Sequence, residues 1–130
     1  MTANSAFRDS SLTTIAILDA DVALRSQMVK LFSSSSCEVE EFNSAEQLLQ
    51  SPNLKDMNCL IISIQPTFSA TKKLIKAIRR QNSSVSIIAI GNYEGIAQAV
   101  TSIRAGADDY IYKPINTGKI RTLVQQLLTK

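Results

Sequence analysis

Short strand-like runs alternate with amphipathic stretches along almost the whole of this 130-residue chain. Most of the runs are apolar and rich in β-branched side chains, as strands are, and they lie at 13–18, 37–42, 59–64, 85–90 and 109–112. Each run is followed by a stretch with helical periodicity. Five strands that alternate with five helices predict right-handed crossovers and a parallel sheet. We therefore expect an α/β fold, with a doubly wound, five-stranded parallel sheet in the strand order 2-1-3-4-5.

The helices are indicated by apolar residues at spacings of three and four positions. Polar residues that can cap a helix precede the second and the fifth of them. The markers are Leu24, Met28, Leu31 and Phe32; Ser44 and Gln47 before Leu49; Leu74, Ile75 and Ile78 within 71–81; Ile96, Val100 and Ile103 before Gly106; and Ile120, Leu123, Val124, Leu127 and Leu128 after Asn116 and Thr117.

The third predicted helix carries a cluster of positive charge, and no acidic residue occurs between Asp56 and Glu94. We interpret the cluster as a solvated helix face; a phosphate- or partner-binding patch is the alternative. A net charge of +3 with 5% aromatic residues is not the pattern of a nucleic-acid-binding domain, so we expect no direct contact with nucleic acid. The clustered cations are Lys72, Lys73, Lys76, Arg79 and Arg80.

Several function classes are excluded by composition. The chain has no histidine, which removes histidine general bases, imidazole metal ligands and phosphohistidine relays. Cys37 and Cys59 lack metal-site or redox spacing, so we expect two buried, reduced thiols. Residues 1–12 have the composition of a flexible leader and not of a signal peptide. No apolar run reaches the ~18 residues of a membrane span, and we expect a cytoplasmic protein without membrane contact.

The chemistry of a sheet like this lies beyond the carboxyl ends of its strands, where the strand order reverses. Of the eleven acidic residues, Asp19 and Asp21 follow a strand at that point, with Ala20 between them. The other strand ends carry Ser63, Gly91, Lys113 and Pro114. These residues form the candidate site.

The order and spacing of four short segments resemble the receiver domain of bacterial two-component response regulators. They are the acidic turn at 19–21 and the segments 43–49 (NSAEQLL), 105–110 (AGADDY) and 113–115 (KPI). The resemblance covers residues 13–130 and implies one receiver-like domain with the flavodoxin-like (βα)5 fold, preceded by the leader at 1–12. It also implies a signalling domain and not an enzyme.

The resemblance implies a phosphoryl-transfer site with five parts, of which this chain keeps two and alters three. In the family, an acidic pair after the first strand holds Mg²⁺. Asp19 matches the first acid, whereas Ala20 stands at the second and Asp21 is expected to cap the next helix. Ser63 stands where the family has its aspartate nucleophile, and Gly91 where it has a hydroxyl.

The two parts that this chain keeps follow the fourth helix. Lys113 matches the family's phosphate-pairing lysine and is followed by the family's proline, Pro114. Tyr110 matches the aromatic switch residue. We expect the Lys113 ammonium to pair with Asp19 or with backbone carbonyls, or else to remain a surface charge. We expect Tyr110 either to lie inward or turn freely without a phosphate trigger, or to be a packed strand aromatic.

The substitution at Ser63 decides the expected chemistry. A serine hydroxyl is un-ionised at neutral pH and needs an adjacent base to become a nucleophile, and this chain has no histidine to serve. Pro66 follows Ser63 by three residues where the family has four, but a slip of one position would bring only Ile62 or Ile64 to the nucleophile position. We therefore expect a degenerate pseudo-receiver with no phospho-acceptor, no catalytic residue and no cofactor, Mg²⁺ binding at Asp19 and Asp21 being weak at most.

The expected function is signalling by protein–protein contact without phosphorylation, through an output domain or a separate protein partner. We expect a homodimer through the fourth helix, fifth strand and fifth helix, whose surface carries a mixture of charges: Arg104, Asp108, Asp109, Lys119 and Arg121. One alternative is a conventional receiver phosphorylated at a non-standard residue. Another is a small-ligand sensor that uses the pocket left by the small residues Ala20, Ser63 and Gly91.

Overall fold

A single parallel sheet with helices on both faces forms the fold. The computed structural model describes residues 12–92 and 95–129, so all but the last residue of the predicted leader lies outside the described part. The elements are β1 (Thr13–Leu18), α1 (Val22–Phe32), β2 (Cys37–Phe42), α2 (Ala45–Leu49), a 3₁₀ turn (Leu54–Asp56), β3 (Cys59–Ser63), α3 (Phe68–Gln81), β4 (Ser86–Gly91), α4 (Ile96–Ala105), β5 (Asp109–Tyr112) and α5 (Thr117–Leu128).

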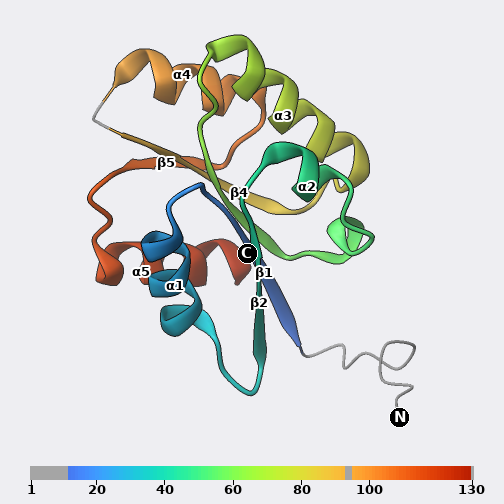
Figure 1. Cartoon of the computed structure of the whole chain (residues 1–130), viewed down its shortest axis with the longest axis vertical. Coiled ribbons are helices and arrows are strands. Elements are labelled where there is room, and N and C mark those ends of the chain that lie inside the picture. The colour runs from blue at the N-terminus through green and yellow to red at the C-terminus, as the bar shows by residue number, and fades with distance from the viewer. Residues whose placement is uncertain (1–11, 93–94, 130) are drawn as a thin grey trace.

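The sheet has five strands in the order β2-β1-β3-β4-β5, and every neighbouring pair is parallel. Helices α1 and α5 cover one face, and α2, α3 and α4 cover the other (Figure 1). Both the predicted fold class and the predicted strand order are therefore confirmed. The six-residue strand β2 lies at one edge of the sheet.

Each face of the sheet has its own core, because successive side chains of a strand point to opposite faces. Ile15 and Ile17 pack with Leu24, Met28 and the buried side of α5. Their neighbours Ala16 and Leu18 pack toward α2 and α3. The central strand β3 contributes buried side chains to both cores, which explains its nearly continuous apolar run: Cys59, Leu60, Ile61 and Ile62.

Helix α4 departs from the usual relation between an apolar stripe and the core. Its stripe of Ile96, Val100 and Ile103 is 82%, 40% and 46% exposed, whereas Ser102 and Ala105 are buried against the sheet. The stripe thus indicates the helix correctly but lies on its outer side. An apolar row of this kind on a surface helix is typical of a contact surface for another protein.

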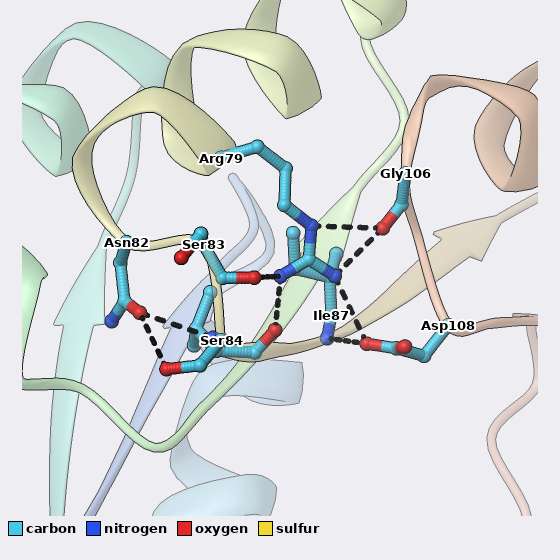
Figure 2. Close-up of polar contacts among 8 residues, drawn as sticks. Arg79, Asn82, Ser83, Ser84, Ile87, Gly106 and Asp108 are labelled. Atoms are coloured by element: carbon cyan, nitrogen blue, oxygen red, sulfur yellow. Dashed lines mark hydrogen bonds and ion pairs between the residues drawn. The ribbon is translucent and has the colours of Figure 1, made fainter.

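The basic helix α3 buries Leu74, Ile75 and Ile78 and exposes most of its cations, as both a solvated face and a partner-binding patch require. Arg79 is different, because its guanidinium is used inside the fold (Figure 2). It donates to the carbonyl oxygen of Gly106 at 2.7 and 3.1 Å, to the carbonyls of Ser83 and Val85, and to Asp108 Oδ2 at 3.1 Å.

The Arg79 contacts join three segments that are distant in sequence. Asp108 Oδ2 also accepts the Ile87 N–H at 2.8 Å, so one carboxylate holds both the arginine and strand β4. Gly106 ends α4 with φ of 127°, a conformation that favours glycine, and a Cβ there would lie 3.3 Å from Arg79 Cγ. The end of α3, the start of β4 and the turn before β5 are held together by this one side chain.

The two cysteines are free. Cys59 is fully buried, and this burial raises the pKa of its thiol to about 12, so the reactive thiolate is not formed at neutral pH. Cys37, in the edge strand, is only half-buried, which corrects the prediction that both thiols are buried. Among the described residues, no helix is long and apolar enough to cross a bilayer.

Candidate functional site

The carboxyl ends of β1, β3, β4 and β5 meet at one edge of the sheet and bring the candidate residues together. A cleft of about 450 Å³ lies at this edge, between the β1–α1 turn, the start of α2 and the loop after β3. Asp19, Ala20, Ser63 and Lys113 all line it. Asp19 and Ser63 are 44 residues apart in the sequence. The parallel register brings their strand ends together, because it places Leu18 beside Ile62 and Ser63 beside Ile90.

Asp19 is the centre of the site. It is 3% exposed, and both of its carboxylate oxygens are occupied. Oδ2 accepts the Ser63 hydroxyl at 2.5 Å and lies 3.0 Å from Lys113 Nζ. Oδ1 accepts the Asp21 N–H at 2.8 Å and lies 3.3 Å from the same ammonium. The expected pairing of Lys113 with Asp19 is therefore confirmed.

The environment of Asp19 keeps it ionised. Burial alone would raise the pKa of this carboxyl group, because a charge is poorly solvated in the protein interior. The hydrogen bonds from Ser63 and from the Asp21 N–H, together with the Lys113 ammonium, outweigh burial and lower the pKa below its ordinary value of 3.8. At neutral pH the site is thus a closed ion pair with a serine hydroxyl bound to it.

Replacing Asp19 by asparagine is expected to lower the free energy of unfolding at pH 7 by about 1–3 kcal/mol. This loss is smaller than that expected for a fully buried ion pair, because the Lys113 side chain is 28% exposed and keeps part of its hydration. A carboxyl with a lowered folded-state pKa stabilises the fold above its unfolded-state pKa and loses this effect as the pH falls through the folded-state value. The difference between Asp19→Asn and the wild type should therefore be full at pH 7 and shrink below about pH 4.

Urea denaturation at a series of pH values measures this difference. Glu41→Gln is the matched control, because Glu41 is in an ion pair with Arg25 at 3.2 Å but its side chain is 44% exposed. The control should change stability by less than about 1 kcal/mol. A constant Asp19→Asn difference from pH 7 down to pH 3 would contradict the role assigned to the ionised carboxylate.

The two residues after Asp19 lie as their chemistry suggests. Asp21 caps α1, since its side chain accepts the N–H groups of Ala23 at 2.9 Å and Leu24 at 3.2 Å, which confirms the predicted N-cap. Ala20 is exposed at the mouth of the cleft and brings no side-chain oxygen. Pro114 follows Lys113 through a cis peptide bond.

Gly91 ends β4, and the ring of Tyr110 fills the space beside it. A Cβ built on Gly91 would lie 1.8 Å from the Tyr110 hydroxyl oxygen and 2.6 Å from Cζ of the ring. The hydroxyl donates to Gln98 Oε1 at 2.9 Å, and the ring is half-buried against the core on the α3 side. Tyr110 therefore lies inward, in a position that only a glycine at 91 permits.

Three further residues belong to the site and were not predicted. Gln98, on α4, holds the Tyr110 hydroxyl and also lines the cleft. Arg25 Nη1 donates to the Asp19 carbonyl at 2.6 Å and fixes the β1–α1 turn. Thr71 Oγ1 accepts the Gln65 N–H at 2.8 Å and fixes the loop after β3. Nothing in the sequence distinguishes these side chains from ordinary helix-surface residues.

Comparison with known proteins agrees with this architecture. The family model described as "Response regulator receiver domain" matches residues 15–125. The response regulator protein TodT of Pseudomonas putida is 28% identical over 116 residues, which is 89% of this chain and 51% of TodT. Nodulation protein W of Bradyrhizobium diazoefficiens is 27% identical over 105 residues, 81% of this chain and 46% of that protein.

Among solved structures, a response regulator receiver domain protein from Methanospirillum hungatei superimposes with a TM-score of 0.79 at 24% identity, over 92% of this chain and 95% of that one. The chain thus spans about half the length of the curated relatives it matches and nearly all of an isolated receiver domain. Fold and sequence agree, and the chain belongs to the response regulator receiver family of two-component signalling.

Proposed function

We propose that this receiver domain transmits its signal by protein–protein contact and accepts no phosphoryl group at the end of β3. The observation that carries the proposal is the closed contact between Asp19, Ser63 and Lys113. The ammonium that would pair with an incoming phosphate is bound to Asp19 Oδ2 at 3.0 Å. The Ser63 hydroxyl at the acceptor position donates to the same oxygen at 2.5 Å.

Among the described residues, Ser63 has no neighbouring base able to activate it. A serine attacks phosphorus only when a neighbouring group removes its proton. The nearest carboxylate is Asp19, whose lowered pKa makes it a weak base. A shift of the acceptor by one position does not help, because Ile62 is 1% exposed in the core and Ile64 is also apolar. The position therefore favours a structural hydroxyl over a nucleophile.

The residues also fit Mg²⁺ poorly. This ion requires near-octahedral coordination and is bound in such sites through carboxylates. Asp19 is one carboxylate, already occupied on both oxygens; Ala20 supplies none; and Asp21 is used in capping α1. We therefore propose that the domain works without a metal cofactor, and no step of its action is assigned to one.

The surface formed by α4, β5 and α5 is proposed as the contact surface of a homodimer. Its support is the exposed apolar row Ile96, Val100 and Ile103, with Tyr112 41% exposed on β5. Arg104, Lys119 and Arg121 are exposed on the same elements and supply charge around the row. Asp108 contributes less to this surface than expected, since its carboxylate is bound by Arg79 and by the Ile87 N–H.

Sedimentation equilibrium tests the dimer. The wild-type chain is expected to dimerise at high micromolar concentration, and Ile103→Lys to raise the dimer dissociation constant at least about tenfold, because it places a charge in the apolar row. Val22→Lys is the control, since Val22 is 63% exposed on α1, which is not one of the elements that form this surface. A wild-type chain that stays monomeric at these concentrations, or equal weakening by both substitutions, would overturn the dimer.

The space for a small ligand is smaller than the small residues in the sequence suggest. Replacing a hydroxyl-bearing residue by Gly91 leaves no empty space, because the Tyr110 ring occupies it. What remains is the open cleft between Ala20, Asn43 and Gln65, next to the Asp19–Lys113 pair. With the lysine charge already neutralised, the described residues that line the cleft include no free cation to hold an anionic metabolite. Contact with a protein is therefore the function we favour.

A further inference from the structure

A second candidate contact surface lies on the opposite side of α3 from the Arg79 contacts, between α2 and α3. It is an open groove of about 590 Å³. Its floor is apolar and made largely of small side chains: Ala45 and Leu49 on α2, and Ala70, Leu74 and Ala77 on α3. The groove exists because α2 has only five residues and cannot cover the whole length of the 14-residue α3.

The alanines of α3 determine the shape of the groove. Ala70, Leu74 and Ala77 recur at spacings of four and three positions, so they lie in one row along the helix. With Arg80 at its end, this row extends over about 15 Å, or about three helical turns. At the C-terminal end of α3, Gln81 Nε2 donates to the Leu49 carbonyl oxygen at 3.4 Å and connects α3 to the end of α2.

The rim of the groove is positively charged. Lys73, Lys76 and Arg80 line it and are exposed. Within the described residues, the ion pairs formed by basic side chains join Arg25 to Glu41, Arg79 to Asp108 and Lys113 to Asp19, and none of them includes a rim cation. The groove therefore has an apolar floor and a positively charged rim, and the rim cations form no ion pair with a carboxylate of the described residues.

We propose that this groove binds an amphipathic helix of a partner protein, with an apolar ridge flanked by Asp or Glu side chains. An apolar row about two turns long, which Arg80 continues to about three turns, matches the side chains that a helix presents at spacings of three and four residues. The three rim cations select carboxylates beside that ridge. An open groove favours a helix lying along it over a small molecule, which binds best in an enclosed cavity.

This proposal is independent of the proposed function, because it uses other residues. The α4–β5–α5 surface contains neither α2 nor the Ala70–Ala77 row of α3. A receiver domain with both surfaces could bind a second copy of itself and an acidic helix at the same time. Each proposal can be disproved without the other, because the homodimer is tested by self-association and the groove by the affinity for an added peptide.

A synthetic peptide tests the groove. The probe is a helix of about 14 residues with leucines at spacings of three and four and glutamates on both sides of them. Backbone amide chemical shifts of the full chain, recorded during a titration, should change on α2 and α3. Lys76→Glu/Arg80→Glu should weaken binding of this peptide at least about tenfold, and Ala77→Gln, which fills the floor without changing charge, should weaken it about as much.

The controls distinguish binding in the groove from nonspecific electrostatic attraction between the acidic peptide and the basic chain. Lys30→Glu/Lys72→Glu changes the net charge equally, but neither lysine lines the groove, so it should change the affinity less than about twofold. Equal weakening by both double variants, equal binding of a scrambled peptide of the same composition, or shift changes confined to α4 and β5 would overturn the proposal. Tighter binding of dodecanoate than of the peptide would overturn it in favour of an anionic amphiphile.

Discussion

Replacing Gly91 by threonine is expected to move the Tyr110 ring out of the fold without unfolding the domain. A Cβ at position 91 would lie 1.8 Å from the Tyr110 hydroxyl oxygen, which is too close for both to remain. The atoms in conflict are at the far end of a rotatable side chain, so the ring turns outward and the backbone stays. The lost hydrogen bond to Gln98 and the lost burial should lower the free energy of unfolding by about 1–3 kcal/mol.

The outward ring is also expected to weaken the proposed dimer. Tyr110 lies on β5, so once displaced it enters the surface between α4 and α5, where the apolar row of α4 is exposed. We expect the dimer dissociation constant to rise about tenfold, which corresponds to about 1.4 kcal/mol. Fluorine NMR of the chain labelled with fluorotyrosine measures the ring, and sedimentation equilibrium measures the dimer.

Asn92→Thr is the matched control for Gly91→Thr. It introduces the same side chain one position later, where the native residue is exposed. The Tyr110 resonance and the dimer should both stay unchanged in this variant. If Gly91→Thr left the Tyr110 resonance in place, or if Asn92→Thr moved it as far, the inward position of the ring would not depend on glycine at 91.

Restoring two carboxylates is expected to turn this domain into a phospho-acceptor. In Ala20→Asp/Ser63→Asp, a second acid joins Asp19 at the β1–α1 turn and a carboxylate replaces the hydroxyl that now lies 2.5 Å from Asp19 Oδ2. Three carboxylates around Lys113 can hold Mg²⁺, and the ion offsets their mutual repulsion. With acetyl phosphate and Mg²⁺, the phosphoryl group should pass to the new Asp at 63 while acetate leaves.

The double variant should gain the mass of one phosphoryl group per chain, and hydroxylamine should remove it, as expected for an acyl phosphate. Ala20→Asn/Ser63→Asn is the control, because it has similar side-chain size but adds no carboxylate. It should gain no mass. Without Mg²⁺, the double variant is expected to be less stable than the wild type, since like charges in a partly buried site repel each other.

The sequence predicts well those features that depend on short-range pattern or on the strand ends of a known topology. The strand order, the N-cap at Asp21 and the pairing of Lys113 with Asp19 are of this kind. The residues at strand ends meet in any sheet of this order, so their approach follows once the strands are recognised. The position of Tyr110 could be narrowed to alternatives, but not decided, because it depends on the room left beside Gly91.

Other features depend on side-chain reach, which spacing along the chain does not reveal. Arg79 is one of five clustered cations, and only the structure distinguishes it as the one that binds the Gly106 carbonyl. The row Ile96, Val100 and Ile103 has the same spacing as a buried stripe, yet it is exposed, because α4 rests on Ser102 and Ala105. The groove between α2 and α3 results from the short length of α2, a boundary that periodicity fixes poorly.

The central claim is that the wild-type chain receives no phosphoryl group, and intact-mass spectrometry tests it most directly. The unmodified chain is incubated with acetyl phosphate and Mg²⁺, beside Ala20→Asp/Ser63→Asp as the positive control. We predict no added mass on the wild type under conditions in which the double variant is modified. A gain of one phosphoryl mass on the wild-type chain, at Ser63 or at any other residue, would contradict the account.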